Sequence, residues 1–121
     1  MMCPQRLILL EDDPADAVLI RRHITLEWPK CEFLVINHEE AFQAAIQQGG
    51  FDLILSDYSL PGFGGASALA LARRFCPQVP FIFISGAIGD EIAVESLKAG
   101  ATDYVLKDRP ARLIPAIRRA M

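Results

Sequence analysis

Short apolar runs alternate along the chain with longer segments in which apolar residues recur at helical spacing. Five of the runs predict strands, at residues 6–10, 32–36, 52–56, 80–85 and 103–106. The first, third and fourth runs are apolar almost throughout, which is typical of strands covered by helices on both faces. The alternation predicts repeated βα units around a parallel sheet, and therefore an α/β fold.

The segments between the strands carry the signals that begin and end helices. Asp13, followed by Pro14 and Asp16, supplies a cap, a first-turn proline and an early acid for the first helix. The buried stripe of that helix would be formed by Ala17, Ile20 and Ile24. Asn37 with Glu40 resembles a capping box for a short second helix. Gly49 would end that helix in a left-handed conformation.

Three more helices are expected in the second half of the chain. The third would cover about 65–76, and the fourth about 90–99, with Gly100 as its stop. The fifth would start near residues 108–110. Pro115 lies inside it, where a proline lacks a backbone donor and crowds the preceding turn. We therefore expect a kink in this helix or a late start.

Length and composition fit one compact domain spanning residues 1–121. The chain is 52% hydrophobic, yet no run approaches the roughly 20 apolar residues that a membrane helix needs. The start also lacks the features of a signal peptide, so we expect a cytoplasmic protein. A formal net charge of -3 argues against nucleic-acid binding through bulk electrostatics. The scattered Cys3, Cys31 and Cys76 indicate neither a disulfide framework nor a zinc site.

Chemically active side chains follow four of the five predicted strands. They are Glu11, Asp12 and Asp13 after the first, Asp57 after the third, Ser85 at the end of the fourth and Lys107 after the fifth. Ligands of open parallel sheets bind at the carboxyl ends of the strands. If the first and third strands are neighbours, about 4.8 Å apart, their terminal carboxylates can share a divalent cation. Oxygen ligands of this kind suit Mg²⁺.

Asp57 is equipped for phosphoryl chemistry if such a cation is present. A bound cation would keep the carboxylate ionised among its acidic neighbours. The cation and Lys107 would both neutralise charge on the oxygens of a phosphoryl group under attack by Asp57. The Ser85 hydroxyl could then donate a hydrogen bond to one of these oxygens. By contrast, the turn formed by Pro61, Gly62, Gly64 and Gly65 holds no GxGxxG pattern and reads as a tight turn.

Four segments carry a family resemblance. They are the acidic cluster after the first strand, "SDYSLPGFGG" around Asp57, "ISGA" around Ser85 and "KAGATDYVLKD" leading to Lys107. In this order and at these spacings, the chain resembles the receiver domain of two-component response regulators along essentially its whole length. The resemblance implies a flavodoxin-like (βα)5 doubly wound sandwich with the strand order 2-1-3-4-5.

The resemblance also implies a function. Asp57 would accept a phosphoryl group from the phosphohistidine of a sensor histidine kinase or phosphotransfer protein. Mg²⁺ would be held by Glu11, Asp12, Asp57 and the backbone carbonyl of Ser59, and Ser85 and Lys107 would contact the phosphoryl group. Such a domain catalyses its own phosphorylation and dephosphorylation but is not a turnover enzyme. It binds neither nucleic acid directly nor a membrane.

Tyr104 would be the aromatic switch of such a domain. It would turn inward when Ser85 moves toward the phosphate, which changes the surface formed by the fourth helix, the fifth strand and the fifth helix. A downstream protein or a linked domain would bind that surface.

Some points stay open at this stage. Asp13 as the helix cap favours Glu11 and Asp12 as the metal pair, but Asp12 with Asp13 is an alternative. Many relatives have a Lys-Pro cis peptide where this chain has Lys107-Asp108. A cis bond before a non-proline residue costs about 2.5 to 4 kcal/mol, so we expect a trans bond or a strained site. The "SDYSLPGFGG" and "LKDRPARLIPAIRRAM" forms look most like receivers attached to sensor kinases, and the chain could be part of a longer protein.

Two other classes of protein compete with this interpretation. A Mg²⁺-dependent phosphatase of the haloacid-dehalogenase type would share the aspartyl nucleophile, the lysine and the metal. It would also need a second aspartate two residues later, where this chain has Ser59. A flavin or nucleotide module of the same architecture would hold a bound cofactor.

Overall fold

The chain folds into alternating strands and helices, as the sequence pattern predicts. The computed structural model describes residues 3–60, 62–86 and 90–121, so Pro61 of the predicted turn and Ala87 of the "ISGA" segment lie outside it. The strands are β1 (Arg6–Leu10), β2 (Glu32–Ile36), β3 (Leu53–Ser56), β4 (Phe81–Ser85) and β5 (Asp103–Leu106). The helices are α1 (Pro14–Glu27), α2 (Glu39–Gln48), α3 (Gly65–Phe75), α4 (Asp90–Lys98) and α5 (Leu113–Ala120). All five predicted strands and five predicted helices are present.

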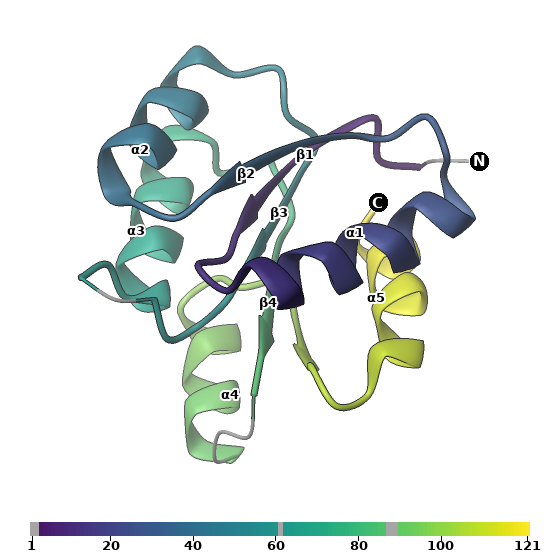
Figure 1. The fold of residues 1–121 in the computed structure, drawn as a ribbon. Helices are drawn as coiled ribbons and strands as arrows, with labels where there is room; N and C mark the ends of the chain where they lie inside the picture. The colour runs from purple at the N-terminus through teal and green to yellow at the C-terminus, as the bar shows by residue number, and fades with distance from the viewer. Residues whose placement is uncertain (1–2, 61, 87–89) are drawn as a thin grey trace.

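The strands form one parallel sheet in the order β2-β1-β3-β4-β5, which confirms the order that the resemblance implied. Helices α1 and α5 cover one face of the sheet, and α2, α3 and α4 lie on the other (Figure 1). The register places the carboxyl end of β1 beside the end of β3, because Leu10 pairs with Ser56. Ser85 at the end of β4 likewise pairs with Leu106 of β5. The residues that follow these strands therefore meet at one edge of the sheet.

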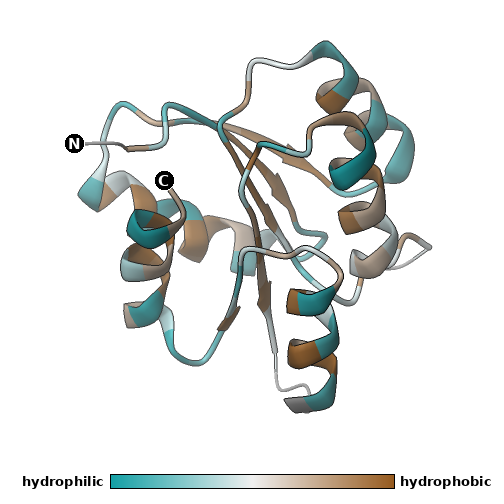
Figure 2. Cartoon of the chain, turned by 180° about the vertical axis from the view of Figure 1, so that it is seen from behind, coloured by the Kyte–Doolittle hydropathy of each residue, from teal (hydrophilic) through white to brown (hydrophobic). Residues whose placement is uncertain are grey.

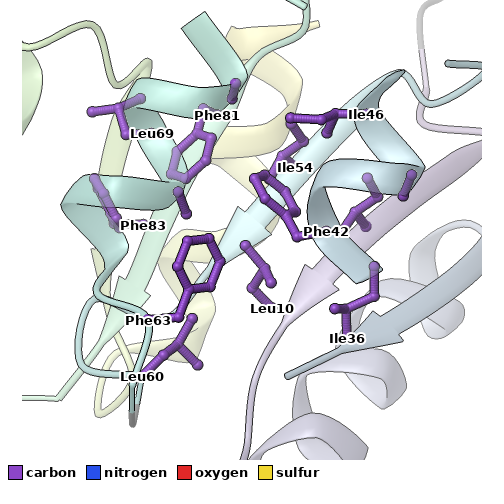
Figure 3. Close-up of a cluster of buried hydrophobic side chains, with 14 of the residues drawn as sticks. Leu10, Ile36, Phe42, Ile46, Ile54, Leu60, Phe63, Leu69, Phe81 and Phe83 are labelled. Carbon is purple, nitrogen blue, oxygen red and sulfur yellow. The ribbon is translucent and has the colours of Figure 1, made fainter. Parts of the chain in front are cut away.

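The central strands are buried on both faces because their apolar side chains alternate between two cores. Figure 2 shows these strands as hydrophobic and most helices as mixed in hydropathy. One core lies under α1 and α5 and contains Leu7, Leu9, Leu53, Leu55, Ile82 and Ile84. The other core lies under α2 and α3 and includes Leu10, Ile54, Phe42, Phe63, Phe81 and Phe83 (Figure 3). Burial of this kind fixes the strand positions and hence the edge at which the polar residues gather.

The start of α1 is confirmed, whereas the predicted cap of α2 is wrong. The Asp13 carboxylate accepts a hydrogen bond from the Ala15 amide at 2.9 Å, as a helix cap should. Helix α2 instead begins after His38, which makes no side-chain capping hydrogen bond. The side-chain oxygen of Asn37 lies 3.2 Å from the His38 ring rather than on a helix amide. The acids in the first turn of α2 are favourable there because they oppose the positive end of the helix dipole.

Helix α5 has the late start that Pro115 predicts. A short 3₁₀ segment (Pro110–Arg112) comes first, and the α-helix begins only at Leu113. Pro115 consequently lies in the first turn of α5, where an amide would have no partner within the helix. Earlier in the chain, Gly49 and Gly100 end α2 and α4 at φ values of 80° and 114°. None of the helices in the described residues is long and apolar enough to cross a bilayer.

Candidate functional site

The backbone of the sheet brings Glu11 and Asp57 together. The Asp57 amide donates a hydrogen bond to the Leu10 carbonyl at 2.9 Å, so the chain after β3 continues alongside the chain after β1. On the other side, the Glu11 amide donates to the Ile36 carbonyl at 3.0 Å. Both acids are buried, with exposed fractions of 4% for Glu11 and 8% for Asp57. Two carboxylates removed from water in this way need cationic partners.

Neutral donors bind one oxygen of the Asp57 carboxylate. The Ser85 hydroxyl donates to Oδ1 at 3.1 Å, and the Ser59 amide donates to the same oxygen at 3.3 Å. Ser85 is itself buried, with 3% of its surface exposed. The structure therefore joins Ser85 to Asp57, as the sequence predicted, and the turn after β3 folds back on its own carboxylate.

Lys107 binds the other oxygen of Asp57. Its backbone amide donates to the Ser85 carbonyl at 2.7 Å, which fixes the base of the side chain at the end of β5. Its ammonium nitrogen lies 2.6 Å from Glu11 Oε1, 2.8 Å from Asp16 Oδ2 and 3.2 Å from Asp57 Oδ2. Although burial alone lowers the pKa of Lys107, the hydrogen bonds and charges of these carboxylates raise it above its ordinary value overall. Lys107 is therefore a fixed cation beside Asp57.

Three of the acids form a cluster that could hold a metal ion. Glu11, Asp12 and Asp57 each offer one oxygen, and these oxygens lie within 4.8 Å of one another. Burial raises the pKa of Glu11, and Lys107 lowers it by hydrogen bonding and charge. An exclusively carboxylate cluster at the end of a sheet fits a hard cation such as Mg²⁺ and does not fit a soft, thiolate-bound one.

The Asp13 side chain caps helix α1 and does not join the candidate metal cluster. The oxygens of Asp13 are absent from the candidate metal cluster of the described residues, and its Oδ1 caps α1 instead. The arrangement favours Glu11 and Asp12 over Asp12 and Asp13 as the metal pair. The peptide bond between Lys107 and Asp108 is trans, which was one of the two expected outcomes.

Tyr104 lies beside the site and faces the interior. Its ring packs against Phe83, with ring centroids 5.9 Å apart. Its hydroxyl oxygen is buried and has no hydrogen-bond partner among the described residues. Burial raises the pKa of Tyr104, the nearby Ser85 hydroxyl lowers it, and the charge of Asp57 raises it further. The sheet register pairs Tyr104 with Phe83, so the phenol stands on the strand next to the one that ends in Ser85.

Gly65 fixes the turn that carries Asp57. Its amide donates to the Tyr58 carbonyl at 2.8 Å, which closes the loop between β3 and α3. A Cβ atom at this position would lie 2.7 Å from the Tyr58 Cα atom and 2.7 Å from the Phe83 ring. No side chain fits there, so a glycine at position 65 lets the helix start pack directly against the Tyr58 backbone and the Phe83 ring. Gly62 takes a φ of 71°, and together these features support the tight turn that the sequence predicts.

Asp16 is the site residue that the sequence analysis did not place at the site. The sequence identified it only as an acid in the first turn of α1. In the structure, its carboxylate lies 2.8 Å from the Lys107 ammonium group, 91 residues away in the chain. The available signal was geometric: the first turn of the helix that follows β1 must lie over the same sheet edge as the end of β1.

Comparison with known proteins gives one consistent family. Residues 7–118 match the family described as "Response regulator receiver domain". The response regulator protein FleR of Pseudomonas aeruginosa is 30% identical over 115 residues, which cover 90% of this chain and 23% of FleR. The chain spans about a fifth to a half of the length of the curated relatives it matches.

Two solved structures show the same architecture. A response regulator receiver domain protein from Methanospirillum hungatei is 28% identical, with a TM-score of 0.82 and coverage of 97% of this chain and 93% of that one. The receiver domain of the sensor histidine kinase PA1611 from Pseudomonas aeruginosa is 24% identical, with a TM-score of 0.81. It covers 98% of each chain, and its structure has a magnesium ion coordinated in the active site cleft.

Proposed function

Because the chain belongs to the family of response regulator receiver domains, which act in two-component signal transduction, we propose that Asp57 is its phosphoacceptor. The donor would be a phosphohistidine on a sensor histidine kinase or a phosphotransfer protein. The observation that carries the proposal is the set of groups around one buried carboxylate: Asp57 contacts Ser85 and Lys107 and shares a cluster with two further acids. Receiver domains are signalling domains and not turnover enzymes.

The transfer follows from this arrangement. An oxygen of the Asp57 carboxylate attacks the phosphorus atom, the P–N bond of the phosphohistidine breaks, and its electron pair returns to the imidazole of the donor. Lys107 neutralises charge on the phosphoryl oxygens, because its ammonium group already lies 3.2 Å from Asp57. The Ser85 hydroxyl, 3.1 Å from the same carboxylate, donates a hydrogen bond to one phosphoryl oxygen after transfer.

Mg²⁺ would be held by Glu11, Asp12 and Asp57, with the backbone carbonyl of Ser59 as a further ligand. When bound, it supplies positive charge that offsets the charge on the phosphoryl oxygens. The compactness of the cluster supports this assignment, as does the magnesium ion in the PA1611 receiver. Asp13 is left out of the ligand set because it caps α1.

Tyr104 would report the phosphorylated state. It lies on β5 beside the end of β4, which carries Ser85, so a movement of Ser85 toward a phosphoryl group would alter the surroundings of the phenol. Tyr104 belongs to β5, and its new position would change the surface formed by α4, β5 and α5. A downstream protein or a linked domain, in the cytoplasm, would bind this surface. Residues 1–121 would form the receiver as one domain.

The test is phosphorylation by a small donor. Incubation with acetyl phosphate and Mg²⁺ should give one alkali-labile, hydroxylamine-sensitive phosphoryl group per chain, located at Asp57 by mass spectrometry and lost slowly after the donor is removed. Asp57→Asn should abolish it with little loss of stability, because the swap keeps the shape and removes a buried charge. Unchanged uptake in that variant would disprove the assignment. Rapid multiple turnover on phosphate esters would instead indicate the phosphatase, against which Ser59 already argues.

A further inference from the structure

We propose that Asp16 is a positioning residue, which holds the Lys107 ammonium group beside the phosphoacceptor in both the free and the phosphorylated domain. The inference rests on the proposed function of Asp57 and Lys107 and adds a residue to it. An ammonium group has three donors, and Lys107 places them among three carboxylates. Those of Glu11 and Asp16 lie at 2.6 Å and 2.8 Å, and that of Asp57 at 3.2 Å.

The three carboxylates differ in what else they must do. Glu11 and Asp57 both belong to the candidate metal cluster, and Asp57 also loses its charge when it becomes an acyl phosphate. When the site is used, Glu11 therefore shares its charge with the metal ion, and the phosphoryl oxygens replace the Asp57 carboxylate as a partner of Lys107. Asp16 is not in the metal cluster formed by the described residues. Its contact with Lys107 therefore does not compete with metal binding or with the phosphoryl group.

The position of Asp16 is fixed by the helix that carries it. It lies in the first turn of α1, whose start is fixed by the cap at Asp13 and whose buried face includes Ala17 and Ile20. Lys107, by contrast, ends in a flexible four-carbon stem whose base is fixed by the bond from its amide to Ser85. A partner on a rigid helix fixes the other end of the stem. The ammonium group is thus placed before any phosphoryl group arrives.

Two effects of Asp16 oppose each other. Its charge repels an incoming phosphoryl group, but its side chain is partly exposed (35%), and water screens that repulsion. Its hydrogen bond to the half-buried ammonium group orders a side chain that otherwise has many rotamers. Asp16 and a phosphoryl oxygen can bind different N–H groups of the same ammonium. Because water screens the repulsion while the hydrogen bond persists, we expect the ordering effect to be the larger one and Asp16 to favour phosphorylation.

The experiment compares phosphorylation rates of the full chain with acetyl phosphate at saturating Mg²⁺. Asp16→Asn should slow phosphorylation about tenfold, on the order of the loss of one charge-assisted hydrogen bond. Glu40→Gln is the matched control. It removes the same charge from the exposed first turn of α2, and it should change the rate less than twofold. An Asp16→Asn rate equal to or above that of the unaltered chain would overturn the proposal.

A double-mutant cycle shows whether Asp16 acts through Lys107. In a Lys107→Ala background, Asp16→Asn should have no further effect on the rate, because the group that it positions is gone. Equal fold-losses in both backgrounds would mean that Asp16 supports the fold or the metal directly, and would overturn the inference. If the unaltered chain takes up no phosphate at all, the proposed function fails and this inference with it. Uptake by the unaltered chain with no change in the Asp16 variant defeats only the role of Asp16.

Discussion

Asp12 and Asp13 are consecutive in the sequence, yet the carboxylate of Asp12 lies in the candidate metal cluster and that of Asp13 caps helix α1. Asp12 is exposed and shares a candidate metal cluster with Glu11 and Asp57. The Asp13 carboxylate instead accepts a hydrogen bond from the Ala15 amide at the start of α1. One of the two aspartates is thus placed for metal binding and the other for helix stability, and substitution can separate these roles.

Millimolar Mg²⁺ should raise the melting temperature of the unaltered chain, because the ion binds the folded cluster in preference to the unfolded chain. Asp12→Asn should remove most of that rise while leaving the metal-free melting temperature nearly unchanged. Asp13→Ala should lower metal-free stability by about 1 kcal/mol, since the helix cap is lost, but keep the rise with Mg²⁺. Calorimetry with and without the ion checks both. A rise that survives in the Asp12 variant and disappears in the Asp13 variant would reverse the assignment.

Gly65→Ala should destabilise the domain by about 1–3 kcal/mol, because the new methyl group would press on the Tyr58 backbone and the Phe83 ring. Gly64→Ala is the matched control, since a Cβ there meets nothing within 4 Å. Gly64 also has an ordinary φ of -68°, so only a small change from the altered helix cap is expected. Urea unfolding of the two variants measures the difference. Equal stabilities would show that the loop after Asp57 can relax.

Alkaline pH should weaken the fold through Cys31. Burial, with smaller effects from Asp52, Cys3 and Glu32, raises the pKa of this thiol from 9.0 to about 11. The folded chain then keeps a proton that the unfolded chain releases, so this part of the stability is complete below pH 9 and is lost as the pH rises to about 11. We expect a loss of roughly 1 kcal/mol, because solvent reaches this half-buried site and reduces the effect.

Cys31→Ala provides the comparison for this pH effect. The free energy of unfolding of the unaltered chain, minus that of the variant, should fall between pH 9 and 11, as measured by urea unfolding at each pH. Other groups that titrate in this range affect both proteins alike. A difference that stays constant with pH would contradict the raised pKa.

Tyr104→Phe should leave stability unchanged or raise it by up to about 1 kcal/mol, because a buried hydroxyl with no partner among the described residues is costly to keep. Tyr104→Ala should cost about 2 kcal/mol, since it removes a half-buried ring that packs against Phe83. Thermal unfolding distinguishes the two. If the Phe variant were as unstable as the Ala variant, the hydroxyl would have to make a stabilising bond.

Much of the fold could be predicted from the sequence because it depends on strong local signals. The buried strands are continuous apolar runs, and the cap at Asp13 and the proline at residue 115 act within a turn of their own positions. The cap of α2 was mispredicted because Asn37 fits the pattern but contacts the neighbouring His38 ring. The strand order came from the family resemblance, since no local pattern determines which strands become neighbours.

Most residues of the site could be predicted from the sequence, but not all of the contacts between them. Residues that follow strands could be assigned to one edge of the sheet, and the structure places Glu11, Asp57 and Lys107 there in contact. The contact between Asp16 and Lys107 depends on how α1 packs against the end of β5. The sequence could place the first turn of α1 at that sheet edge, but not its contact with Lys107, which is a property of the tertiary structure.

The 2.7 Å hydrogen bond from the Lys107 amide to the Ser85 carbonyl has a mechanical consequence. The hydroxyl and the ammonium group that reach Asp57 stand on backbones joined directly to each other. A displacement of the β4 terminus is therefore transmitted to the β5 terminus without passing through any side chain. Ser85 and Lys107 are thus coupled through the backbone as well as through their contacts with Asp57.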